Sequence, residues 1–323
     1  MFKQVIAALI GIAIATCAQA APRDVRIAYI TSNLSPLYVD AKLFTEAINK
    51  KLPGQFKFTL YPNGQLGKEA AEIDNLELGS LEMGVVASGM TKAVRKLGIF
   101  DLPWLFSNIK EVRHALAGPL GEEIRDQVKK DTGMIVIGIY ENGFRDVINR
   151  KRPIREPKDI AGLKIRVAGG KFRQDVFRRL GANPTPVDWT ETFTALQTGV
   201  VDGAEAAIYG FYEAKLYEAA QYISLTHHVY SPSFLLVSNT FFKSLTPAQR
   251  KAFLDTGREI EEAVYKTTNA NEQKYLKAMS SKVKINKVDI AAFRKLVHPV
   301  YDDYVKKEGG DWLKLIENAR KPH

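Results

Sequence analysis

An arginine at the end of an expected strand has the clearest potential for binding chemistry. Arg166 lies in the run Lys164–Val167, and Gly169–Gly170 follow at the start of an expected helix. In open α/β sheets, ligands bind beyond the carboxyl ends of the strands, and free N–H groups at a helix start favour anions. A guanidinium also matches a carboxylate with two parallel hydrogen bonds. These residues predict an anion site, with a structural salt bridge of Arg166 as the alternative.

Residues that commonly carry catalysis are not arranged in known catalytic patterns. The five histidines form no H-E-x-x-H metal motif, and the single cysteine is Cys17. Val86–Gly89 comes nearest to a nucleophile elbow but lacks its first glycine. Gly169–Lys171 resembles the end of a phosphate-binding loop, yet Ile165 stands where the first glycine belongs and Phe172 replaces the Ser or Thr. We therefore expect no enzyme activity, no metal and no cofactor.

The first twenty residues resemble an export signal. Lys3 precedes the apolar run Val5–Ala15, and Ala18–Ala20 offers a small-x-small cleavage site. The run is shorter than the roughly 20 residues that a membrane-spanning helix needs. We expect a signal peptide over residues 1–20, cleavage after Ala20 and a periplasmic mature chain. Lipidation at Cys17 is the less favoured alternative, because threonine precedes the cysteine.

The formal net charge of +10 raises the question of an anionic partner. Basic residues are scattered, and the longest runs are short, such as Arg150–Arg152. Solvated basic faces explain this distribution better than a nucleic-acid site. We therefore expect no nucleic-acid binding, and only a weak general attraction for anions.

Strand and helix patterns alternate in two tandem α/β blocks, which predicts right-handed crossovers and mostly parallel sheets. Strands are expected at 25–30, 57–61, 83–87, 134–139, 146–149, 164–167, 201–206, 222–225 and 230–238. Helices are expected from Ser35–Pro36 onward and at 68–78, 171–180 and 189–198, with a loop at 182–186.

The C-terminal part predicts a long helix that braces both blocks. Thr246–Gln249 is a capping box with proline at the first helical position. The helical pattern continues to about residue 278, and roughly 30 helical residues would extend about 45 Å. We expect lobe I to comprise 21–143 plus 229–270, and lobe II 144–228 plus 271–323.

Five sequence blocks follow one another over nearly the whole chain: Tyr61–Gly67 (YPNGQLG), Leu102–Phe106 (LPWLF), Asp159–Val167 (DIAGLKIRV), Gly181–Pro186 (GANPTP) and Thr194–Gly203 (TALQTGVVDG). In order and spacing, these blocks resemble the solute-binding proteins of tripartite ATP-independent periplasmic (TRAP) transporters, the DctP family.

This resemblance implies a two-lobed fold that closes on a small carboxylate ligand. It implies that Arg166 anchors the carboxylate, that Arg145 approaches the ligand and that Trp189 packs against it. Core packing is the alternative for Trp189. Glu69 and Ser88 follow strand ends and are candidates for hydrogen bonds to ligand hydroxyls, with a helix cap or surface position as the alternative.

One departure from the family pattern leaves the ligand open. Many relatives carry Gln-Glu-Asn-Pro after Asp-Gly, and their asparagine helps to hold the carboxylate. This chain has Ala206 at that place, and Tyr209 is a candidate substitute donor. A C4-dicarboxylate, a sugar acid such as a uronate, and a monocarboxylate with an apolar tail are the possible ligands.

The resemblance also implies partners. The closed, liganded protein would deliver its ligand to a small and a large TRAP membrane subunit, and we expect it to be a monomer. An accessory protein that docks on a signalling receptor is the alternative function. A secreted hydrolase is disfavoured, because the sequence offers no nucleophile or metal constellation.

Overall fold

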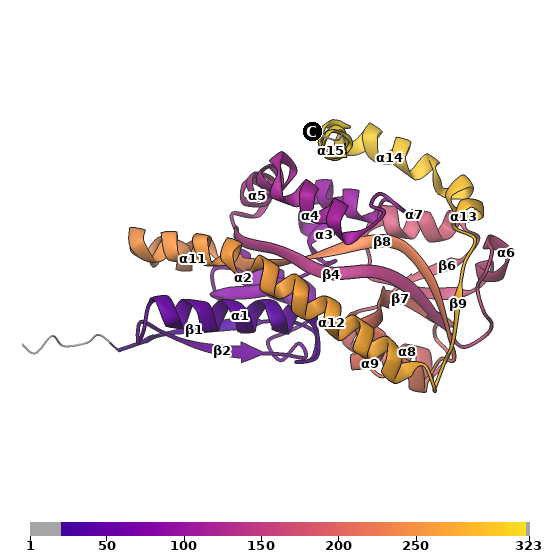
Figure 1. Ribbon diagram of the computed structural model, residues 1–323, viewed down its shortest axis with the longest axis horizontal. Helices are drawn as coiled ribbons and strands as arrows, with labels where there is room; N and C mark the ends of the chain where they lie inside the picture. The colour runs from indigo at the N-terminus through magenta and orange to yellow at the C-terminus, as the bar shows by residue number, and fades with distance from the viewer. Residues whose placement is uncertain (1–20, 321–323) are drawn as a thin grey trace, which may run out of the picture.

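Two long antiparallel strands, β4 (Ile135–Asn149) and β8 (Tyr222–Val237), run through the centre of the computed structural model, which describes residues 21–320 (Figure 1). Each replaces two shorter expected strands. The pairing register shifts at three places, including Glu141/Gly143 and Arg145/Val147. Such bulges bend a strand without ending it. The expected breaks were therefore wrong, because polar residues at a bulge resemble a turn in sequence.

The strands belong to one nine-stranded mixed sheet in the order β2-β1-β3-β8-β4-β7-β5-β6, and β9 pairs with β8. At one end, β1 (Arg23–Ala28) lies parallel to β2 (Phe56–Tyr61) and β3 (Met83–Val86). The helices of this half are α1 (Pro36–Lys51), α2 (Glu69–Leu78), α3 (Met90–Ala93), α4 (Ile109–Ala117) and α5 (Pro119–Thr132). The expected start of α1 is confirmed, because the Ser35 side chain accepts a hydrogen bond from the Tyr38 N–H.

At the other end, β5 (Lys164–Val167) lies parallel to β6 (Asn183–Pro186) and β7 (Gly203–Ala207). The helices here are α6 (Pro157–Ile160), α7 (Lys171–Arg179), α8 (Thr192–Gln197) and α9 (Ile208–Glu213). The loop expected at 182–186 was wrong, since four of those five residues, Asn183–Pro186, form β6. Two prolines are tolerated there because β6 is an edge strand, where a missing N–H leaves no central ladder bond unmade.

The C-terminal segment crosses the molecule. After α10 (Asn239–Ser244) come α11 (Pro247–Glu259) and α12 (Glu261–Met279), and the capping box of Thr246 is confirmed. One continuous helix was expected, but the helix divides at Ile260. Near that point Gly257 lies against β4, and the Tyr140 hydroxyl donates to its carbonyl oxygen at 2.7 Å. Helix α12 contacts both α1 and α9, so it braces the two halves as expected.

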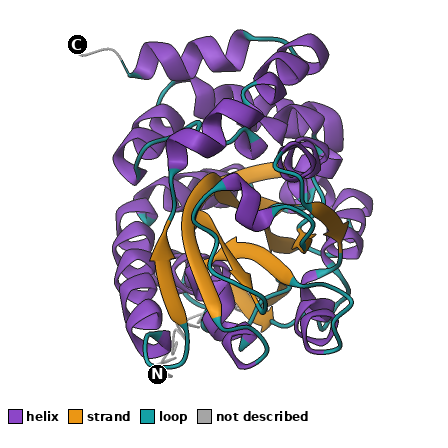
Figure 2. Ribbon diagram, turned by 90° about the vertical axis from the view of Figure 1, so that its right-hand side faces the viewer, coloured by secondary structure: helices purple, strands orange, loops and turns teal. Residues whose placement is uncertain are grey.

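The chain ends in β9 (Lys284–Lys287), α13 (Ile290–Val297), α14 (Pro299–Glu308) and α15 (Asp311–Ala319). Helices α13 and α14 contact α7, whereas α15 contacts α4 and α5. Figure 2 shows helices on both sides of the twisted sheet. The two-lobed α/β class is thereby confirmed. Within residues 21–320, none of the helices has the length and apolar character needed to cross a membrane. The signal peptide expected over 1–20 lies outside the described residues.

Candidate functional site

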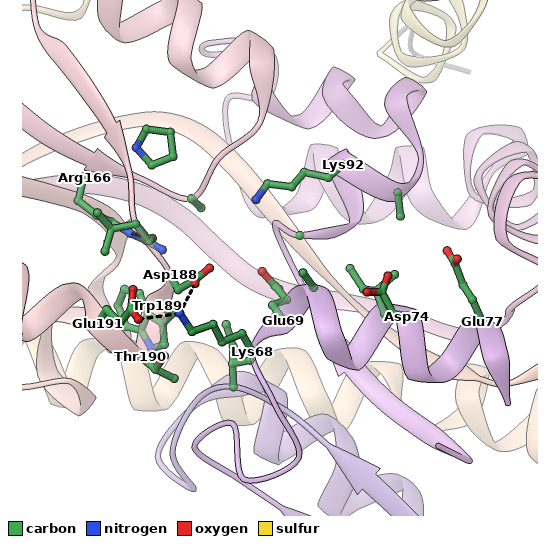
Figure 3. A pocket seen from close by; sticks show the side chains of 18 of the residues that line it. Lys68, Glu69, Asp74, Glu77, Lys92, Arg166, Asp188, Trp189, Thr190 and Glu191 are labelled. Atoms are coloured by element: carbon green, nitrogen blue, oxygen red, sulfur yellow. Dashed lines mark hydrogen bonds and ion pairs between the residues drawn. The ribbon is translucent and has the colours of Figure 1, made fainter. Parts of the chain in front are cut away.

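A cleft of about 610 Å³ lies between the two halves of the sheet. One wall is formed by α2 and α3, and the other by the segments that follow β5 and β6 (Figure 3). Its inner end continues into a small chamber of about 40 Å³. All six residues expected at the site line this chamber: Glu69, Ser88, Arg145, Arg166, Trp189 and Tyr209.

Arg166 is a buried guanidinium without an acidic partner among the described residues. It is 3% exposed, and its Nε donates to the Val187 carbonyl oxygen at 2.9 Å. Its Cζ lies 5.2 Å from the centroid of the Trp189 ring. Burial lowers the pKa of Arg166 to about 10, although Glu205 and Glu69 act in the opposite direction. The charge is therefore poorly solvated, and an anion in the cleft would offset that cost.

Arg145, in contrast, already has a carboxylate partner. Its Nε and Nη2 donate to the two carboxylate oxygens of Glu205 at 2.5 and 3.0 Å, and Nη2 also reaches the backbone oxygen of Glu205. Arg173 and His228 lie 3.5 and 3.4 Å from the same carboxylate. Burial alone would raise the pKa of Glu205, but Arg145 and Arg173 hold it well below its usual value.

Arg173 was missed in the sequence because it sits in the basic helix α7, whose charges resembled a solvated face. It is 1% exposed and pairs with Asp101, a residue of the first half. Its Nη1 donates to the Ser88 hydroxyl at 3.2 Å. The glycine pair before α7 was the available signal, since it allows α7 to start close to Asp101. A Cβ on Gly170 would lie only 1.9 Å from the Asp101 carboxylate.

A hydroxyl and amide network forms the floor of the chamber. The Ser88 and Ser231 hydroxyls are 3.0 Å apart, and the Asn142 amide donates to Ser231 at 3.2 Å. The Tyr209 hydroxyl donates to the Asn142 side-chain oxygen. Ala206 lines the same chamber, so Tyr209 and Asn142 are the polar groups near the missing asparagine. Asn142 was overlooked because Glu141–Gly143 resembled a turn.

Glu69 and Trp189 face the cleft from opposite walls (Figure 3). One carboxylate oxygen of Glu69 accepts from the Ala87 N–H at 3.1 Å. Trp189 begins a 3-10 helix (Trp189–Glu191), and its indole N–H donates to Glu213 at 2.9 Å. Trp189 therefore carries a second contact in addition to Arg166.

A lysine bridges the mouth of the cleft. The ammonium of Lys68, just before α2, lies 2.9 Å from Asp188 and 2.6 Å from Glu191, on the opposite wall. Hydrogen bonds to Asp188 and Glu191 raise the pKa of Lys68. Lys92, also in the cleft, has no acidic partner within residues 21–320. In that part of the chain, the structure contains no cluster of three or more His, Cys, Asp or Glu placed to hold a metal.

Comparison with known proteins places these features in context. Residues 27–308 match the sequence model of DctP, described as bacterial extracellular solute-binding protein, family 7. A 2,3-diketo-L-gulonate-binding periplasmic protein of Escherichia coli is 29% identical over 316 residues, covering 96% of each chain.

Two solved structures resemble the fold over nearly its whole length. A TRAP periplasmic solute-binding protein of a Polaromonas species, bound to D-erythronate, has a TM-score of 0.89 and 30% identity. The match covers 93% of this chain and 100% of that one. A sugar-acid-binding protein of Advenella mimigardefordensis, in complex with galactonate, has a TM-score of 0.88 and 30% identity, with 93% and 98% covered.

Proposed function

The chain belongs to the DctP family of bacterial extracellular solute-binding proteins, and from this premise we propose that it captures a small organic acid in the periplasm. Its ligand is then delivered to the small and large membrane subunits of a TRAP transporter. Relatives named for periplasmic ligand binding support the compartment, and cleavage after Ala20 remains part of the proposal.

The observation that carries the proposal is the unpaired charge of Arg166. A buried guanidinium with one backbone hydrogen bond has N–H groups left for a carboxylate, and a bidentate pair fixes the orientation of the acid. The Trp189 ring then forms the adjacent wall. Arg145, Ser88 and Tyr209 complete the inner chamber.

The charge pattern favours a hydroxylated acid with one carboxylate. Arg145 is neutralised by Glu205, which leaves Arg166 as the unpaired buried cation of the chamber. Glu69 faces the same space and would repel a second carboxylate, whereas it accepts hydrogen bonds from hydroxyls. The relatives bound to D-erythronate and galactonate are consistent with this preference. A C4-dicarboxylate would require Lys92 as a second cation.

Capture is proposed to proceed by closure of two lobes, 21–143 plus 229–270 and 144–228 plus 271–323. The boundaries cross β4 and β8 close to the bulges, and His227 beside them has a φ of 42°. Ligand stabilises the closed form only to the extent that it binds that form better. Arg166 is already buried without a ligand, so closure serves to exclude the solvent of the cleft from the Arg166–carboxylate pair, and the lower effective dielectric strengthens it.

A thermal-shift screen of aldonates, uronates, C4-dicarboxylates and apolar monocarboxylates tests the proposal. A ligand present at a hundredfold excess over its Kd stabilises the folded protein by about 2.7 kcal/mol. We expect the largest rise in Tm with a hydroxylated monocarboxylate. No rise with any acid would refute the proposed function, and a rise confined to C4-dicarboxylates would refute the charge argument.

A further inference from the structure

Glu213 at the end of α9 connects the aromatic wall of the cleft to the opposite lobe. One of its carboxylate oxygens accepts the Trp189 indole N–H at 2.9 Å. The other accepts the backbone N–H of Ser32 at 2.7 Å. Ser32 follows β1 in the first lobe, whereas Glu213 and Trp189 belong to the second. The carboxylate therefore spans the boundary between the lobes.

No basic side chain within residues 21–320 forms an ion pair with Glu213. Burial raises the pKa of Glu213, and the Ser32 and Trp189 N–H groups counteract that rise. The side chain and backbone N–H of Ser32, together with the Trp189 indole N–H, thus stabilise the charged form of Glu213. If the lobes separate, Ser32 moves away and its contribution is lost. The strength of the hydrogen bond between the Trp189 indole and Glu213 then depends on whether the lobes are closed or open.

Other contacts hold the loop of the first lobe that contains Ser32. The Tyr275 hydroxyl of α12 donates to the Leu34 carbonyl oxygen at 2.9 Å. Tyr275 also stacks on Tyr212, the residue before Glu213, with ring centroids 4.6 Å apart. The loop that contains Ser32 is therefore held from α9 and from α12. Glu213 is the member of this group that also contacts the cleft wall.

We propose that Glu213 is a positioning residue that couples lobe closure to the orientation of Trp189. When the lobes close, Ser32 fixes the carboxylate, the carboxylate fixes the indole, and the indole supports the guanidinium of Arg166. The ligand thus meets a rigid anchor only in the closed form. This inference rests on the proposed function, because it assigns Glu213 a role in holding the acid.

A double-mutant cycle with Glu213→Gln and Trp189→Phe tests the coupling. Glutamine keeps the size but replaces one acceptor oxygen with a donor, and phenylalanine keeps an aromatic ring without the N–H. We expect each single variant to raise the Kd of the best acid about tenfold, mainly through faster dissociation. The double variant should also bind about tenfold more weakly, since both changes break the same link. Glu218→Gln, an exposed change in the segment after α9, is the matched control and should leave the Kd unchanged.

Two spectroscopic readouts separate positioning from a merely structural role. In the ligand-free protein, the Trp189 indole N–H resonance should follow the titration of Glu213 and lose that response in Glu213→Gln. With ligand, the Ser32 amide should become protected from hydrogen exchange in the wild type and less so in the variant.

The inference would be overturned if the increases in Kd of the two single variants multiplied in the double variant. It would also be overturned if the chemical shift of the Trp189 indole N–H did not change with pH. An absence of acid binding by the wild type would instead refute the proposed function. In that case the indole response still decides whether Glu213 holds Trp189.

Discussion

Replacing Arg166 with alanine should weaken ligand binding and should not destabilise the ligand-free protein. Without an acidic partner, the buried guanidinium is a cost in the free protein, as the lowering of its pKa to about 10 indicates. Each pKa unit corresponds to about 1.4 kcal/mol, which makes the penalty roughly 3 kcal/mol. The lost hydrogen bond to Val187 and the lost packing on Trp189 offset part of the gain. We therefore expect the Tm of ligand-free Arg166→Ala to equal or exceed that of the wild type.

Binding should change in the opposite direction. Removing one member of a buried, hydrogen-bonded charge pair typically costs about 2–5 kcal/mol, or roughly 30-fold to several thousandfold in Kd. Isothermal titration calorimetry with the best acid measures this loss. Arg166→Lys keeps the charge without the planar fork and should lie between alanine and the wild type.

Arg179→Ala is the matched control. Arg179 pairs with Asp303 on the surface at 3.0 Å, with both side chains partly exposed, so its removal should alter stability and affinity little. If Arg166→Ala binds the acid as tightly as the wild type does, the anchor assignment is refuted. If ligand-free Arg166→Ala is much less stable than the wild type, Arg166 instead forms a stabilising interaction within the protein.

Further predictions concern the mouth of the cleft, a buried acid and the kink of the long helix. Lys68→Ala should speed ligand dissociation at low ionic strength. The difference from the wild type should become smaller at high salt, because the ion pairs of Lys68 with Asp188 and Glu191 are exposed to solvent. A difference in stopped-flow dissociation rates that does not depend on salt would contradict this. Burial and the charge of Glu69 raise the pKa of Glu72 to about 8. Between the normal carboxyl pKa and about 8, the unfolded chain loses this proton while the folded protein keeps it, so the free energy of unfolding falls by up to about 1.4 kcal/mol per pH unit. Glu72→Gln removes this loss, and its Tm advantage should grow with pH; a constant difference would be contrary evidence. Gly257→Ala should lower the free energy of unfolding in urea by about 1–3 kcal/mol, because its Cβ would lie 2.2 Å from the Ile137 carbonyl oxygen.

The sequence predicted helix starts well where a single capping residue determines the backbone conformation. Ser35 and Thr246 mark helix starts in sequence, and each caps its helix as expected. The continuity of β4 and β8 was not predictable in this way, because a bulge and a turn use the same residue types. The division at Ile260 likewise depends on how α11 packs against β4, which local helix propensity does not describe.

The site shows the same division. Arg166 was predictable because a family block and a strand end mark it, and the family resemblance pointed to Trp189. Arg173, Asn142 and Glu213 were not predictable, since each acquires its role from a partner far away in sequence: Asp101, Ser231 and Ser32. Charge type and spacing predict which residues could bind an anion. They do not show which of those charges are already neutralised inside the protein.

The carboxylate of Glu205 has a consequence for how this binding site can change over evolutionary time. It is shared by Arg145, Arg173 and His228, so replacing Glu205 or either arginine alone alters the charge balance of a buried cluster. Burial lowers the pKa of His228, so its replacement removes a polar contact and not a charge. Such positions are expected to vary together or not at all. Ligand preference can be altered at lower risk in cleft-wall residues outside that cluster, such as Glu69. Selection for a new acid, in nature or in the laboratory, should therefore accumulate its first successful substitutions along the wall.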